Sequence, residues 1–212
     1  MQENKSDNKF FVYVRKILEL MGANALWIIA CIPLFTIGPA SAALFYTIRT
    51  NLIKDREHVW TAFRRGFRNN FKQGLLLTLI MLGLLLFLYG DSVALIVLAE
   101  QGKLNSGLSG LFYALMALVF LYFQWVFVYL SKYENTIRNT LKNVLFIALI
   151  NLPTTLYIAV LWAAGAAIMY LLWPTILVLP GVIQWLICVR VEKVFDKYER
   201  SEEETEEEKT DS

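Results

Sequence analysis

The sequence is poor in the residues that carry most enzyme chemistry and most covalent cross-links. Its 212 residues include one histidine and two cysteines, and only 18% of them are Asp, Glu, Lys or Arg. Cys31 and Cys188 lie inside apolar stretches and show no CxxC spacing, so no disulfide framework is predicted. His58 has no second histidine to complete a metal site, and no GxxxxGK[ST] loop for a nucleotide is present. We therefore expect a non-enzymatic protein with no catalytic residue, metal or cofactor.

Charge is missing altogether from four long stretches of the chain. No Asp, Glu, Lys, Arg or His occurs in Leu20–Ile48, Gln73–Gly90, Leu104–Ser131 or Asn143–Val189. About 18 such residues are enough to cross a bilayer core of about 30 Å as a helix. Together with the 57% of apolar residues, these stretches exclude a soluble enzyme, a secreted disulfide scaffold, a disordered chain and a nucleic-acid-binding domain. The predicted fold class is all-α, a polytopic bundle of transmembrane helices.

The basic residues lie between these stretches and predict the orientation of the bundle. Residues 1–16, 49–72, 132–142 and 190–200 hold eighteen Lys and Arg residues, whereas the connection 91–103 holds only Lys103. Because cytoplasmic loops are enriched in Lys and Arg, the four basic segments and both termini are predicted to be cytoplasmic. This arrangement gives about six membrane helices in hairpins, with turns near Gly102–Gly107 and Gly165–Leu172. Trp173 would then lie at the interface, and Pro174 would begin the last helix.

The first apolar stretch is too short for two complete spans and contains helix-breaking residues. Pro33 and Pro39 lack the backbone donor that a helix needs, and Gly38 permits backbone angles closed to other residues. We expect a turn within Ile32–Pro39 that separates two short or tilted helices, with Arg49 snorkelling to the membrane surface. The alternative is a single span, which gives five membrane helices and an external N-terminus.

A change in charge at residue 200 divides the chain. Residues 1–200 are predicted to form one integral-membrane domain, and residues 201–212, with six glutamates, to form a disordered acidic cytosolic tail. Within the domain, residues 68–80 match residues 138–150 at six of thirteen positions. Such a repeat indicates parallel helical hairpins; the alternative is a chance match between two helix starts rich in Leu, Asn and Lys.

The segment Val59–Lys72 combines aromatic and basic residues at helical spacing. The aromatic residues fall within about 80° of one helix face and the basic residues occupy the adjoining arc. The two sets are Trp60, Phe63, Phe67 and Phe71, and Arg64, Arg65, Arg68 and Lys72. This pattern is typical of a basic amphipathic helix in the membrane interface. It predicts a site for membrane lipids, anionic ones in particular, or for a cytosolic partner; in a third interpretation the charges only mark the cytoplasmic side.

Two further sets of residues have more than one interpretation. Tyr122, Trp125, Tyr129 and Tyr133 recur near the cytoplasmic end of a predicted helix. They are predicted to be an interfacial aromatic belt, with a stacking platform for a sugar-like ligand as the alternative. The uncharged polar residues inside the apolar stretches are Asn24, Thr36, Thr47, Gln124, Asn151, Thr154, Thr155 and Gln184. They indicate either polar packing between helices or a path for a polar solute.

Three motifs resemble the YesL-like family of bacterial integral membrane proteins. The first runs from Leu26-Trp27 through Ile32-Pro33-Leu34-Phe35-Thr36-Ile37-Gly38-Pro39-Ala40 to Ala43-Leu44-Phe45-Tyr46. The others are Phe67-Arg68-Asn69-Asn70-Phe71-Lys72-Gln73, and Lys142-Asn143 with Asn151-Leu152-Pro153. The resemblance implies a domain of unknown function in the bacterial cell membrane and supplies no catalytic residue.

The resemblance also implies a context for the function. Members of this family are often encoded beside sugar-uptake ABC transporters, which implies an accessory or regulatory protein with carbohydrate ABC transporter subunits as partners. The alternative function is a small-solute permease or channel component, indicated by the repeat, the broken first hairpin and the intramembrane amides. Nucleic acid is not expected as a partner.

Overall fold

The chain folds into helices over the residues that the structure describes. The structure is a computed structural model, and it describes residues 5–100 and 107–210. The α-helices are α1 (Lys5–Ala30), α2 (Ile37–Thr47), α3 (Val59–Glu100), α4 (Gly107–Leu130), α5 (Ile137–Ile150), α6 (Leu152–Leu171) and α7 (Leu179–Thr210). Two 3₁₀ segments, η1 (Leu34–Thr36) and η3 (Trp173–Leu177), and a π-helix, η2 (Ile48–Ile53), lie between them. No strand occurs in the described ranges, so the all-α prediction is confirmed there.

Three helices are long and apolar enough to cross a membrane. They are Val59–Ala99 of α3, Ser109–Leu130 of α4, and α6. The six predicted membrane helices are not confirmed, because the other described helices are too short or carry charge. α2 has 11 residues and α5 has 14, and at about 1.5 Å per residue neither reaches across a bilayer core of about 30 Å. α7 has eleven uncharged residues before Arg190.

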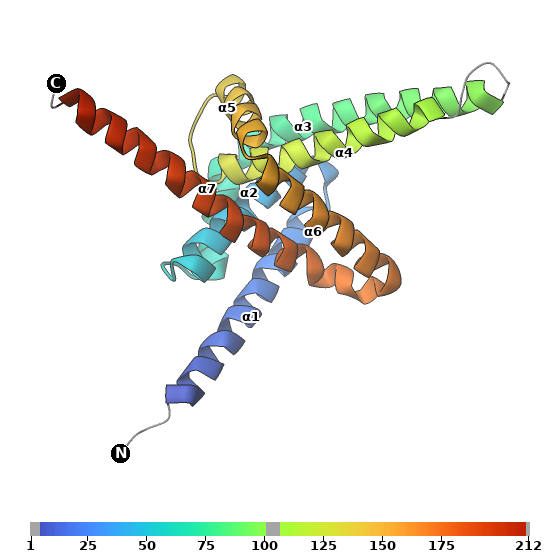
Figure 1. The fold of residues 1–212 in the computed structure, drawn as a ribbon. Helices are drawn as coiled ribbons and strands as arrows, with labels where there is room; N and C mark the ends of the chain where they lie inside the picture. The colour runs from blue at the N-terminus through green and yellow to red at the C-terminus, as the bar shows by residue number, and fades with distance from the viewer. Residues whose placement is uncertain (1–4, 101–106, 211–212) are drawn as a thin grey trace.

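α2 lies where the other helices converge (Figure 1), and it is buried over residues 38–45. Its first turn packs directly on the backbone of α3. The Gly38 N–H donates a hydrogen bond to Thr78 Oγ1 at 2.9 Å, and the Thr78 hydroxyl donates to the Gly74 carbonyl at 2.7 Å. A Cβ added to Gly38 would overlap Thr78 and lie 2.5 Å from the Gly74 carbonyl oxygen. Small residues therefore bring α2 and α3 into backbone contact.

The first apolar stretch is interrupted between α1 and α2. α1 ends at Ala30, Pro33 precedes η1, and α2 begins at Ile37. Gly38 and Pro39 thus lie in the first turn of α2, just after the interruption. The predicted break residues Pro33, Gly38 and Pro39 therefore lie at or next to the interruption. Proline is tolerated there because the first turn of a helix needs no partner for its N–H groups. We expected Gly38 to permit the backbone angles of a turn. In the structure Gly38 is helical, and its missing side chain allows α2 to pack closely against α3.

Val59–Lys72 is not a separate interfacial helix. It forms the N-terminal third of α3, which continues without a break from Val59 to Glu100. The predicted helix over Val59–Lys72 is present, but it is not separate, because nothing between Lys72 and the apolar stretch stops a helix. The glycine at this junction, Gly74, lies under Pro39 of α2, and this contact holds it in the helical conformation.

Other predicted boundaries differ from the structure. Gly165 lies inside α6 and packs against Ile183, and the turn after α6 comes later, at residues 172–178. Pro174 therefore lies in η3, and the last helix begins at Leu179. The backbone of α7 continues through residues 201–210, where the composition predicts disorder; glutamate is a good helix former. The predicted turn at residues 102–107 lies almost entirely outside the described residues.

The four basic segments of the sequence come together at one end of the molecule, which we call the charged end. From residues 1–16, Arg15 Nη2 pairs with Asp55 at 3.0 Å, and Lys16 donates to the Leu52 carbonyl at 3.0 Å. Arg49 of η2 pairs with Glu192 of α7 at 2.7 Å. The segment after α4 is joined to α3 at the same end, because the Gln73 amide donates to the Asn135 carbonyl at 2.9 Å.

An apolar hairpin extends away from the charged end. Figure 1 shows α3 and α4 side by side as an arm that projects from the body of the molecule. Large apolar side chains on its outer half are exposed, among them Leu86, Phe87, Leu111 and Leu118. Apolar surface of this extent is expected in lipid and not in water, so the arm is the part of the fold best suited to crossing a membrane.

Candidate functional site

A buried ion pair organises the charged end. Arg49 is 5% exposed and Glu192 is 8% exposed, and their side chains meet at 2.7 Å between Nε and Oε2. Arg49 Nη1 also donates to the Ser131 carbonyl at 3.1 Å. Arg49 was predicted to snorkel to the membrane surface, and this prediction was wrong. The π-helical turn η2 and the facing α7 enclose the guanidinium, and Glu192 balances its charge there.

Lys132 joins the end of α4 to one face of α7. Its Nζ lies 2.8 Å from Glu199, 3.7 Å from Glu192 and 3.8 Å from Asp196. These three acidic residues are spaced four and three positions apart, so they share one helix face. The same ammonium lies over the rings of Tyr133 and Phe195, 5.5 and 5.3 Å from their centroids. Lys132 is thus held by charge and by cation–π contact.

The ionisation of two groups is shifted by these contacts. Burial alone would raise the pKa of Glu199, but its hydrogen bonds to Lys132 and Tyr133 and the positive charge of Lys132 hold that pKa below the ordinary 4.5. Burial raises the pKa of Tyr133 well above its ordinary value, and the hydrogen bond to Glu199 and the negative charge of Glu199 raise it further. Tyr133 therefore stays a hydrogen-bond donor and Glu199 stays a carboxylate at neutral pH.

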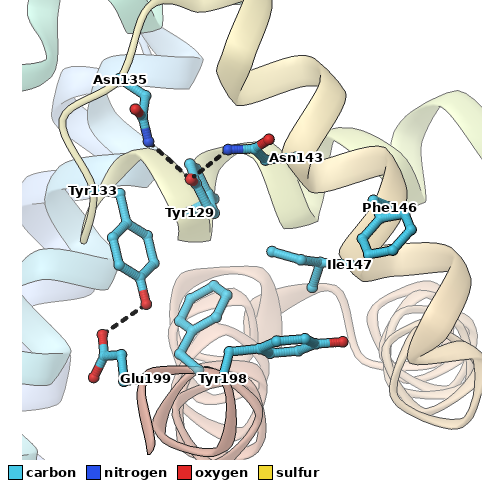
Figure 2. A pocket seen from close by; sticks show the side chains of 9 residues that line it. Tyr129, Tyr133, Asn135, Asn143, Phe146, Ile147, Tyr198 and Glu199 are labelled. Carbon is cyan, nitrogen blue, oxygen red and sulfur yellow. Dashed lines mark hydrogen bonds between the residues drawn. The ribbon is translucent and has the colours of Figure 1, made fainter. Parts of the chain in front are cut away.

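A pocket of about 440 Å³ opens beside this cluster, between α4, α5 and α7 (Figure 2). We call it the aromatic pocket. It is lined by Tyr129, Tyr133, Asn135, Asn143, Phe146, Ile147, Phe195, Tyr198 and Glu199. Five of these residues carry aromatic rings, and one of the five, Phe146, lies at the exposed edge of the pocket. Its size lies in the range of small-molecule sites, which combine apolar walls with a few polar groups.

The aromatic row predicted to be an interfacial belt is mostly interior. Trp125 and Tyr129 are buried, and Tyr122 is half-buried with its hydroxyl donating to the Leu141 carbonyl at 2.7 Å. Trp125 Nε1 donates to Thr155 Oγ1 at 3.1 Å. Two members of the row, Tyr129 and Tyr133, line the aromatic pocket. The row therefore joins α4 to α5 and α6.

The predicted basic–aromatic surface is divided by the fold. Phe63 is buried and Phe67 is half-buried against the core, whereas Trp60 and Phe71 are exposed. The rings of Phe63, Phe67 and Phe71 form a continuous row, with centroids 6.3 and 5.4 Å apart. The basic residues Arg64, Arg65, Arg68 and Lys72 are all exposed. The row of phenylalanine rings and the exposed basic side chains thus lie on different sides of α3. Trp60 lies on the basic side.

An open groove of about 480 Å³ follows the basic side of α3. We call it the basic groove. It is lined by Trp60, Thr61, Arg64, Arg65, Arg68 and Asn69. Arg65 pairs with Glu57 at 2.5 Å, whereas within the described part of the chain Arg64 and Arg68 make no ion pair. The groove therefore presents two uncompensated guanidinium groups beside an exposed indole.

Lys132, Glu192 and Glu199 were not singled out from the sequence, and neither was the aromatic pocket. The spacing of Glu192, Asp196 and Glu199 was a usable signal, because three acidic residues on one helix face need a cation when that face is buried. Nothing in the sequence alone places Lys132 opposite them, since sixty residues separate it from Glu192.

The fold and these sites define a helical protein with three helices long and apolar enough to cross a membrane and with an ion-paired polar end. Residues 20–92 match the model of a family described as "Protein of unknown function, DUF624". The match covers about a third of the chain and includes the contact between Gly38 of α2 and Gly74 of α3. No curated protein and no solved structure matches the chain.

Proposed function

We propose that this protein is a non-enzymatic accessory or regulatory component of a sugar-uptake ABC transport system in the bacterial cell membrane. The resemblance to YesL-like proteins supports this context, and the family match to residues 20–92 agrees with a domain of unknown function. In this proposal the charged end and both termini are cytoplasmic, and the apolar arm of α3 and α4 crosses the membrane.

The basic groove is the observation that carries the proposal. Several charges of the charged end are paired within the molecule, as in the contacts of Glu192 with Arg49 and Lys132. Arg64 and Arg68 remain exposed next to Trp60. An exposed patch that combines arginine with an aromatic residue is typical of protein interfaces. We propose that an acidic surface of a transporter subunit docks there.

The small-solute permease is the second candidate and has less support. Several polar residues of the apolar stretches make hydrogen bonds inside the protein. Thr47 donates to the Ala43 carbonyl at 2.7 Å, Thr36 to the Ala30 carbonyl at 2.5 Å, and Asn151 to the Tyr198 hydroxyl at 2.9 Å. These hydrogen bonds stabilise helix ends and helix contacts, which favours the packing role of these residues over a role in a solute path.

The test is co-purification from native membranes with the double variant Arg64→Gln/Arg68→Gln. We expect the wild-type chain to retain ABC transporter subunits and the double variant to lose most of them. Arg65 is left unchanged because it pairs with Glu57. Arg138→Gln is the matched control, since Arg138 is an exposed arginine at the start of another helix of the charged end, and it should retain the partner.

Three results would contradict the docking proposal. The first is equal retention of subunits by wild type and double variant. The second is loss of bound anionic lipid without loss of a protein partner, which assigns the groove to lipid headgroups. The third is solute flux in proteoliposomes that contain the pure protein, which favours the permease.

A further inference from the structure

We propose that the aromatic pocket binds a neutral, polyhydroxylated group such as a sugar ring. The pocket shares no residue with the basic groove. This proposal therefore goes beyond the docking proposal and is tested independently of it. It rests on three properties of the pocket, which are its balanced charge, its fixed hydrogen-bonding groups and its aromatic walls.

Charge compensation within the pocket disfavours a charged ligand. Glu199 is the acidic residue of the lining, and its Oε1 already receives Lys132 Nζ at 2.8 Å and the Tyr133 hydroxyl at 2.7 Å. A cationic ligand would have to compete with Lys132 for Glu199, because Lys132 already balances the charge of this carboxylate. An anionic ligand would meet the carboxylate of Glu199. Burying either charge without a free partner is costly, so a neutral ligand fits best.

Tyr129 supplies a fixed donor. Its hydroxyl oxygen accepts hydrogen bonds from the side-chain amides of Asn135 and Asn143, at 2.9 and 3.2 Å (Figure 2). A phenolic oxygen has two lone pairs, so these bonds fill its acceptor capacity and leave its own proton to donate. Tyr129 is buried and lines the pocket. A ligand oxygen inside the pocket is therefore the natural acceptor for this proton.

The acceptors of the pocket call for a ligand with several donors. The two contacts of Glu199 reach Oε1, so Oε2 keeps its capacity to accept hydrogen bonds. Asn135 and Asn143 also line the pocket, and each keeps its amide oxygen as an acceptor because its nitrogen is the atom that contacts Tyr129. Hydroxyl groups both donate and accept, so a polyol can satisfy Tyr129 and these acceptors together.

The walls provide the apolar part of the match. The rings of Tyr133 and Phe195 meet edge to face, with centroids 5.4 Å apart, and Tyr198 lies beside them in the lining. A sugar ring presents C–H groups on its faces and hydroxyls at its edge, which suits aromatic walls with polar groups between them. A purely apolar ligand would cover the two asparagines without satisfying them, which is unfavourable.

The same polyol could come from a free saccharide or from the headgroup of a glycolipid. Phe146 and Asn143 of α5 are both exposed at the edge of the pocket, so the opening combines apolar and polar surface. The experiment therefore has one arm for each source.

The test uses the full chain in lipid nanodiscs and measures binding by isothermal titration calorimetry and by saturation-transfer NMR. The free-saccharide probes are methyl glucoside and maltose, and the second arm compares nanodiscs with and without diglucosyl diacylglycerol. Choline and inorganic phosphate are the cationic and anionic controls. We expect saturable binding in at least one sugar arm and none with either control.

Two variants locate the binding. Tyr129→Phe keeps the ring and removes the donor, so we expect about tenfold weaker binding; Tyr122→Phe, on the same helix but outside the pocket, should bind as wild type does. Ile147→Trp fills the pocket and should abolish binding, whereas Ile150→Trp, at an exposed position of α5, should not. Thermal unfolding shows which variants are folded.

Several results would overturn the proposal. They are absence of binding in both sugar arms, binding of choline or phosphate in their place, or sugar binding that is unchanged in a folded Ile147→Trp variant. None of these results depends on retention of a transporter subunit, which tests the basic groove.

Discussion

Arg49 and Glu192 form an ion pair inside the protein. The sequence alone predicts that Arg49 lies at the surface. Arg49 follows an apolar stretch, and a basic residue there normally extends to the membrane surface. In the fold it meets Glu192 from a helix 143 residues further along the chain. Removing one partner of a buried pair leaves an unpaired charge in a poorly solvated place. The pair therefore makes the folding of η2 depend on the docking of α7.

Glu192→Gln should lower the free energy of unfolding by about 3 kcal/mol, because it leaves Arg49 buried without a counter-charge. Unfolding by SDS in mixed micelles, followed by tryptophan fluorescence, measures this change. Lys193→Gln is the control, since Lys193 is the exposed neighbour on α7, and it should change the stability by less than about 0.5 kcal/mol. Equal effects of the two substitutions would contradict the assigned role of the pair.

Glu199 should make the stability of the charged end depend on acidic pH. Its pKa is lowered in the folded state, mainly because Lys132 and Tyr133 outweigh the effect of burial. A lowered pKa contributes stability above the ordinary value of 4.5, and this contribution is lost as the pH falls through the lowered folded pKa. Glu199→Gln should remove that part of the pH dependence. The check is a series of thermal unfolding curves from neutral to acidic pH, with Glu134→Gln as an exposed control; parallel curves for wild type and Glu199→Gln would contradict it.

At the level of elements, the contact between α2 and α3 sets the position of the short central helix. The two helices meet through their backbones and not through large side chains. The contact involves Gly38, Gly74 and Thr78 and includes two hydrogen bonds. This contact also explains why α3 passes unbroken through Gly74, a residue that weakens helices elsewhere. The basic N-terminal part of α3 is therefore continuous with the part of this helix that is long and apolar enough to cross a membrane.

Two glycines of α3 should respond in opposite ways to the same substitution. A Cβ at Gly74 would lie 2.7 Å from the backbone nitrogen of Pro39, so Gly74→Ala forces α2 and α3 apart and should destabilise the protein by about 1–3 kcal/mol. At Gly83 no atom lies within 4 Å of the added Cβ, so Gly83→Ala should be neutral or stabilise by up to about 1 kcal/mol. SDS unfolding of both variants provides the measurement. A stable Gly74→Ala variant would show that the helices do not touch there.

The helical class, the three long helices and the interruption near Pro33 could be predicted from the sequence, because each depends on local composition. The number of spans could not, because the apolar stretches give length but do not say where a helix ends. Asn151 ends α5 with a non-helical backbone angle, and Leu152 and Pro153 begin α6 directly after it. This divides an apolar run that is long enough for two spans into a short helix, one span and the start of α7.

The sites were less accessible to prediction than the fold. The exposure of Arg64 and Arg68 follows from the helical spacing of charged and aromatic residues, which the sequence shows. The aromatic pocket depends on Tyr129 and Glu199, which lie seventy residues apart and meet only when α7 packs beside α4 and α5. A contact of this range has no signature in one sequence.

At the scale of the whole molecule, contacts from the four basic segments form the charged end, and the arm of α3 and α4 projects from the body of the molecule (Figure 1). The charge distribution predicts that this end is cytoplasmic. The same orientation is needed for the basic groove to reach a cytosolic surface of a transporter. The central claim is therefore that the charged end is cytoplasmic and that the far end of the arm is outside the cell.

Cysteine-accessibility labelling of intact cells tests this claim most directly. Cys31 and Cys188 are first replaced by serine and alanine, and single cysteines are then placed at Asn4, Thr136, Lys193 and Asn105. A membrane-impermeant maleimide should label the Asn105 position in intact cells, and the other three positions only after the membrane is permeabilised. Labelling of Thr136 or Lys193 from outside would contradict the account, and labelling of Asn4 alone would place the N-terminus outside.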